Sequence, residues 1–189
     1  VGPGPAGTET RVVEAPGPAA YKYPMMRRLF AFGTEAAVRT PLVMWFDDDS
    51  HVTARDPWGW LADVERLFAG SRPADVVGQV FTMRKGFLPG QAEWVAGRPW
   101  YAGRPVRDGH KVPFATGGWW AARTAVLRRH DWPDPDIVHN GGDEMLGELI
   151  RQQRYVLVDH HAGVAVNTAP RRGASLTRVG AGPQVPQKG

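Results

Sequence analysis

The chain has 189 residues, of which 42% are hydrophobic and 22% charged, so it is long enough to bury one sizeable core and is expected to form a single domain. It contains no cysteine, which excludes disulfides, zinc–thiolate sites and thiol nucleophiles. The formal net charge of +4 comes mainly from arginine, which suits anionic ligands such as phosphates and equally reflects genomic composition. The chain has no compact basic run, so no nucleic-acid partner is expected.

The two ends of the chain differ in composition from its middle. Residues 1–10 and 173–189 are rich in Gly, Pro and small polar residues, so they are expected to be disordered tails around one domain at residues 11–172. No apolar stretch approaches the roughly 20 residues of a membrane helix, and the N-terminus has no charged segment followed by an apolar one. These features predict a soluble, cytoplasmic protein with no transmembrane segment.

Candidate strands and helices alternate along the first half of the domain. The predicted elements are a short strand at residues 10–16, a helix at 23–40, a buried strand at 42–46, a helix that Pro57 opens and Gly70 closes, and a strand at 75–82. Strands that alternate with helices indicate an α/β layered sheet.

The second half continues the alternation after an irregular stretch. Its predicted elements are a functional loop or insertion at residues 83–113 with a short helix near Glu93, a strand-like run at 114–124, a short helix ending near His130, a helix at 141–153 and a strand at 155–159. The helix at 141–153 has the clearest pattern, because four apolar residues share one face and charges are expected opposite them. These apolar residues are Met145, Leu146, Leu149 and Ile150.

Three carboxylates, Asp47, Asp48 and Asp49, follow the buried strand directly. In an extended segment Asp47 and Asp49 would project together while Asp48 points away. Two carboxylates on one side suit Mg²⁺ or Mn²⁺, which commonly takes one or two carboxylates plus substrate phosphates. The alternative is a solvated turn before the next helix.

A second acidic group opens the helix at 141–153. Asp143 and Glu144 occupy its first turn, where carboxylates simply stabilise the helix N-terminus, or where one of them accepts a proton from a substrate hydroxyl. Gly141 and Gly142 precede them and permit close approach of a ligand to the backbone.

Two further motifs allow both a functional and a structural interpretation. His160 and His161 follow the last predicted strand, where one of them is a candidate third ligand for Mn²⁺ or both are surface residues. Trp119 and Trp120 follow the pair Gly117 and Gly118 and could stack on a sugar or pack in the core.

The order of these motifs resembles the metal-dependent GT-A glycosyltransferases, especially the family 2 type. "FDDDS" is similar to the DxD motif of that family, "FATGGWWAART" to its donor- and acceptor-facing segment, and "GGDEMLGELIRQQ" to its acidic-pair helix. The resemblance covers residues 24 to about 168. It implies an α/β, GT-A fold with a mixed sheet flanked by helices.

The resemblance also implies a nucleotide-sugar donor, UDP- or GDP-linked, and a glycan or other hydroxyl acceptor, with an inverting outcome. Asp49 would bridge Mn²⁺ or Mg²⁺ to the donor diphosphate, and Asp47 or Asp48 would help to hold ribose or metal. Asp143 or Glu144 would deprotonate the acceptor.

Further residues take roles from the same resemblance. His161, or His160, would be the late metal ligand, and Gly117, Gly118, Trp119 and Trp120 would face the substrates. Arg171 would touch the diphosphate from a C-terminal segment, although a solvated basic tail is an equal alternative.

One departure from the family pattern concerns the N-terminal part. Only the stretch at 10–16 and one helix precede Asp47, so the first nucleotide-binding strand of the fold is expected to be missing. The sequence is then an N-terminally incomplete fragment, or the tail replaces that strand, or donor binding has been lost. Two other functions remain open: a non-catalytic sugar- or partner-binding module of the same fold, and a metal-dependent phosphoester hydrolase.

Overall fold

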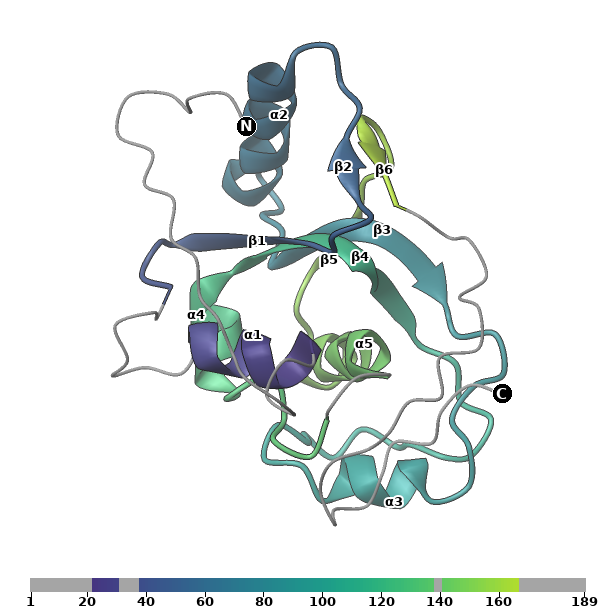
Figure 1. The fold of residues 1–189 in the computed structure, drawn as a ribbon. Helices are drawn as coiled ribbons and strands as arrows, with labels where there is room; N and C mark the ends of the chain where they lie inside the picture. The colour runs from purple at the N-terminus through teal and green to yellow at the C-terminus, as the bar shows by residue number, and fades with distance from the viewer. Residues whose placement is uncertain (1–21, 31–37, 138–140, 167–189) are drawn as a thin grey trace.

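A computed structural model describes residues 22–30, 38–137 and 141–166 of the chain (Figure 1). The predicted strand at residues 10–16, both predicted tails and Arg171 lie outside these described residues. The expectation that the first nucleotide-binding strand of the fold is missing therefore stays a prediction.

Four strands form one mixed sheet. They are β1 (Leu42–Phe46), β3 (Val76–Thr82), β4 (Pro113–Arg123) and β5 (Leu157–Asp159), in the order β1-β4-β3-β5. The central strand β4 runs antiparallel to both neighbours, whereas β3 and β5 are parallel. The predicted strands at 42–46, 75–82, 114–124 and 155–159 are thus confirmed, as is the expected mixed α/β sheet flanked by helices.

Helices cover both faces of this sheet (Figure 1). Helix α2 (Pro57–Ala69) lies on one face, and α1 (Lys22–Phe30), α4 (Thr124–Arg129) and α5 (Gly142–Gln153) lie on the other. A two-residue ladder between β2 (His51–Val52) and β6 (Val164–Ala165) stands beside α2. None of the helices in the described ranges is long and apolar enough to cross a membrane.

Helix α2 begins and ends where its sequence predicts. The Asp56 side chain accepts hydrogen bonds from the backbone N–H groups of Trp58 at 3.1 Å and Gly59 at 3.0 Å, and Pro57 follows at the first helical position. One face of the helix packs toward the sheet, and its buried residues are Trp60, Val64 and Phe68. Because these residues are four apart, they lie one above another on the same helix face.

Helix α1 is shorter than predicted. The expected helix at 23–40 is confirmed over Lys22–Phe30, residues 31–37 are outside the described ranges, and residues 38–40 are not helical. Thr40 precedes Pro41, a position that disfavours helical backbone, and its hydroxyl donates to Leu42 O at 2.7 Å.

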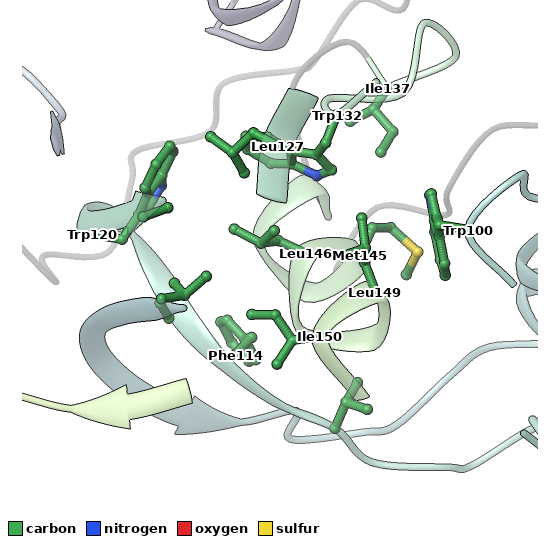
Figure 2. Close-up of a cluster of buried hydrophobic side chains, with 14 of the residues drawn as sticks. Trp100, Phe114, Trp120, Leu127, Trp132, Ile137, Met145, Leu146, Leu149 and Ile150 are labelled. Carbon is green, nitrogen blue, oxygen red and sulfur yellow. The ribbon is translucent and has the colours of Figure 1, made fainter. Parts of the chain in front are cut away.

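Helix α5 is buried on more than one face. The four predicted apolar residues, Met145, Leu146, Leu149 and Ile150, pack in the main core beside β4 and α4 (Figure 2). Glu144, Glu148 and Arg151 lie on the side of the helix opposite these residues, as expected from the helical period. Glu144 and Glu148 are nevertheless buried, as is the neutral Gln152.

The segment at 83–113 covers the second face of α5. It contains the predicted short helix, α3 (Gln91–Ala96), and it contributes Phe87, Trp94 and Trp100 to the same core. Gln152 Oε1 accepts from the backbone N–H groups of Ala102 and Arg104, both at 3.1 Å. This long connection is therefore part of the hydrophobic core.

Glu148, which is 0% exposed, holds the last turn of α5 together. Its carboxylate accepts from Arg151 Nε at 2.8 Å, from Arg151 Nη2 at 2.6 Å and from Gln152 Nε2 at 2.7 Å. Arg151 Nη2 also donates to Pro105 O at 3.1 Å. The network fixes the 83–113 segment to the helix.

Replacing Glu148 by alanine should lower the free energy of unfolding by about 3 kcal/mol, because the cation of Arg151 and the amide of Gln152 lose their buried acceptor. Urea denaturation measures this change. Glu65, exposed on α2, is the control, and Glu65→Ala should change the same quantity by less than about 0.5 kcal/mol. Equal effects of the two substitutions would contradict the role given to this network.

Candidate active site

Three of the predicted motifs meet at the point along β4 where β1 ends. The backbone N–H of Asp47, directly after β1, donates to Gly118 O at 2.9 Å. The backbone N–H of Gly117 donates to Asp143 Oδ2 at 3.3 Å, which joins β4 to the first turn of α5. The aspartate triplet, the glycine pair and the acidic pair, far apart in the sequence, therefore lie against one another.

Lys22, the first residue of α1, lies at the centre of this arrangement. Its Nζ donates to Asp47 Oδ1 at 2.6 Å, to Asp47 Oδ2 at 2.9 Å and to the carbonyl oxygen of Gly117. The indole N–H of Trp45 donates to Asp47 Oδ1 at 2.8 Å. The side chains of Lys22 and Asp47 are each only 13% exposed, so this ion pair is largely withdrawn from water.

The two members of the acidic pair have different surroundings. Asp143 is partly exposed, and its Oδ1 accepts from the backbone N–H of Glu144 at 3.0 Å. Glu144 is only 5% exposed. A substrate hydroxyl can thus approach Asp143 more readily than Glu144.

Tyr23 fixes the position of Asp143 from the side of α1. Its ring is 3% exposed and covers Gly142, where an added Cβ would come within 2.2 Å of the tyrosine Cζ. Burial raises the pKa of the Tyr23 hydroxyl well above its ordinary value of 10, and the nearby Asp143 carboxylate raises it further. Tyr23 is therefore a neutral hydrogen-bonding group and not a base.

The glycine pair leaves room for these contacts. A Cβ on Gly117 would lie 2.9 Å from Lys22 Nζ and 3.6 Å from Asp143 Oδ2. A Cβ on Gly118 would lie 2.2 Å from Val166 Cγ1 and 3.0 Å from Ser50 Oγ. Gly118 thus has no room for a side chain, whereas a Cβ on Gly117 would meet the end of the Lys22 side chain.

The aspartate triplet does not continue the extended strand. Ser50 N–H donates to Asp47 O at 3.0 Å, which makes a turn at residues 47–50. Asp47 points toward α1, whereas Asp48 and Asp49 are exposed, so the expectation that Asp47 and Asp49 project together is wrong. Ser50 Oγ lies 3.5 Å from Asp49 Oδ1, close to the glycine pair.

The two histidines contact aromatic rings and Asp159. The His160 ring packs against Trp60 and Trp119 at centroid distances of 6.3 Å and 6.1 Å, on the α2 side of the sheet. Burial lowers its pKa below 6.5, and its buried Nε2 has no hydrogen-bond partner among the described residues. His161 Nε2 is 2.8 Å from Asp159 Oδ1, and both side chains are more than half exposed.

Within residues 22–30, 38–137 and 141–166, no group of three His, Cys, Asp or Glu side chains is arranged to hold a metal ion. A divalent ion at this site would therefore take most of its ligands from water or substrate.

The two tryptophans after the glycine pair are core residues. Trp119 is 0% exposed and stacks on Phe46, at a centroid distance of 5.9 Å, on the α2 side. Trp120 is 1% exposed and packs edge-on against Trp132, at 5.6 Å, on the side of α5. Neither ring is open for stacking on a sugar.

Sequence reasoning missed Lys22 and Tyr23. No motif surrounds them, and their partners Asp47 and Asp143 are distant in the chain. The adjacent pair of a cation and an aromatic residue at the start of a predicted helix was the one local signal.

Comparison with protein-family models gives no match for this chain, and no curated protein matches it. The site is therefore interpreted from its own geometry.

A double-mutant cycle on Lys22 and Asp47 tests the central ion pair. We expect Lys22→Met and Asp47→Asn to be coupled by about 1–3 kcal/mol in the free energy of unfolding, because the pair is largely buried. Arg66 and Asp63 of α2 form the control pair, whose side chains are 76% and 53% exposed, and their coupling should stay below about 0.5 kcal/mol. Additive effects of Lys22→Met and Asp47→Asn would show that the two side chains do not interact in solution.

Proposed function

We propose that this chain carries the catalytic site of a glycosyltransferase of the GT-A type, which moves a sugar from a nucleotide-diphosphate donor to an acceptor hydroxyl with inversion. The observation that carries the proposal is the meeting of Asp47, Gly117 and Asp143. A metal-dependent inverting transfer uses a carboxylate base beside acidic groups that hold the donor diphosphate through a cation. Both features lie beside the glycine pair of β4, Gly117 and Gly118.

Asp143 is the base in this proposal. Two backbone N–H groups, of Gly117 and Glu144, donate to its oxygens and orient the carboxylate. The acceptor hydroxyl gives its proton to Asp143 while its oxygen attacks the anomeric carbon. The bond from that carbon to the donor phosphate breaks, and the nucleoside diphosphate leaves with the electron pair.

The exposed carboxylates of Asp48 and Asp49 are the groups that would hold Mn²⁺ or Mg²⁺. They fit such an ion because it commonly takes one or two carboxylates and completes its shell with water and phosphate oxygens. When bound, the ion would neutralise negative charge on the leaving diphosphate. Asp47 is already engaged by Lys22, and the His160 ring packs against Trp60 and Trp119.

Nucleotide binding is the first test of the proposal. We expect UDP or GDP to raise the melting temperature of the chain only when Mn²⁺ is present, because a ligand that binds the folded state alone stabilises it. Asp49→Ala should abolish this shift, whereas Asp108→Ala, at an exposed position in the 83–113 segment, should preserve it. A shift that is independent of both metal and Asp49 would count against the transferase and favour a non-catalytic binding module.

Turnover with a panel of UDP- and GDP-sugars is the second test. Asp143→Asn should reduce turnover by about 10²–10⁴-fold and leave the nucleotide-induced melting shift intact, because the amide cannot accept the proton. Glu144→Gln is the matched variant and should keep most of the activity. The reverse result would assign the base to Glu144. Release of phosphate from a generic ester, without any nucleotide-sugar turnover, would favour the phosphoester hydrolase.

A further inference from the structure

The ammonium group of Lys22 occupies the position at Asp47 where a bound cation would sit. Its Nζ is within hydrogen-bonding distance of both Asp47 carboxylate oxygens and of Gly117 O. The rings of Tyr23 and Trp45 lie beside it, with centroids 5.9 Å and 5.8 Å from Nζ. A lysine ammonium has three N–H donors, and three protein oxygens surround it.

Lys22 is held in this position by the packing of α1. The next residue, Tyr23, is buried against Gly142, and Met26 and Phe30 bury the same helix in the main core. The ammonium therefore stays near Asp47 as part of the folded structure, unlike a lysine on a free surface.

An ammonium and a divalent ion cannot use the same Asp47 oxygens at once. Their charges repel strongly at a distance of a few ångströms in a partly buried site. A divalent ion also needs direct oxygen contacts of about 2.0–2.6 Å. Any ion bound through Asp47 would first have to displace Lys22.

We propose that Lys22 is a positioning residue. It forms an ion pair with Asp47 and so prevents Asp47 from coordinating a divalent metal ion. The exposed Asp48 and Asp49 are then the carboxylates left for the metal, and two exposed carboxylates bind it weakly on their own. Metal binding becomes strong only when a diphosphate adds its oxygens. This inference rests on the proposed function only in assuming that a divalent ion binds beside the triplet.

Titration with Mn²⁺ alone, followed by electron paramagnetic resonance of the free ion, tests the proposal without any activity measurement. We expect Lys22→Met to bind Mn²⁺ at least about tenfold more tightly than the unmodified chain, because Asp47 becomes available as a ligand. Asp47→Asn alone should change the affinity by less than about threefold, since Asp47 is not a ligand when Lys22 is present.

The double variant separates this mechanism from a general change in charge. Lys22→Met combined with Asp47→Asn should lose the tenfold gain, whereas a gain caused only by removing a positive charge would persist. Lys111→Met removes a charge at an exposed position and should leave Mn²⁺ affinity unchanged. Circular dichroism and urea denaturation check that each variant is folded.

Three outcomes would overturn the proposal: equal or weaker Mn²⁺ binding by Lys22→Met, a gain that survives in the double variant, or no Mn²⁺ binding by either protein at 10 mM. If the variants bind Mn²⁺ as expected but the chain turns over no nucleotide-sugar, the proposed transferase function is wrong and the role assigned to Lys22 still holds.

Discussion

The site depends on the fact that β1 ends well before its longer neighbour β4 does. Strand β1 pairs with β4 along residues 119–123 and stops before it reaches Gly117. The backbone N–H and C=O of Gly117 therefore need partners other than β1, because buried backbone groups are almost always hydrogen-bonded. Asp143 accepts from the N–H, and Lys22 donates to the C=O. The gap in the ladder thus brings α1 and α5 to the same residue of the sheet.

The groups that fill this gap also offset the negative charges of Asp47 and Asp143, which come from separate segments of the chain. Asp47 is neutralised by Lys22 and also accepts from the indole of Trp45. Asp143 accepts from two backbone N–H groups at the start of α5, where the helix dipole also favours a negative charge. Each carboxylate has its own compensation, so the site can form before any ligand binds.

How much could be predicted from the sequence depends on how far apart the interacting residues are. The limits of α2 were predictable because Pro57 and Gly70 mark them locally. The apolar face of α5 was predictable because its residues lie three and four positions apart. The candidate site at the triplet and the acidic pair was recognised from residue type. Lys22 and the buried Glu148 were not, since their roles depend on segments that only the folded chain brings together.

The turn after β1 divides the aspartate triplet into two parts with different electrostatics. Strand alternation would put Asp47 and Asp49 on one side, but the hydrogen bond from Ser50 N–H to Asp47 O bends the chain first. Asp47 becomes a compensated, largely buried carboxylate, while Asp48 and Asp49 stay in water. From the sequence alone, a metal site and a solvated turn are alternative interpretations of the triplet. In the structure the turn itself exposes the carboxylates of Asp48 and Asp49, so the two interpretations are compatible. In the proposed function, an anionic diphosphate would be repelled by that exposed pair unless a cation lay between them, which is why the proposal includes a divalent ion.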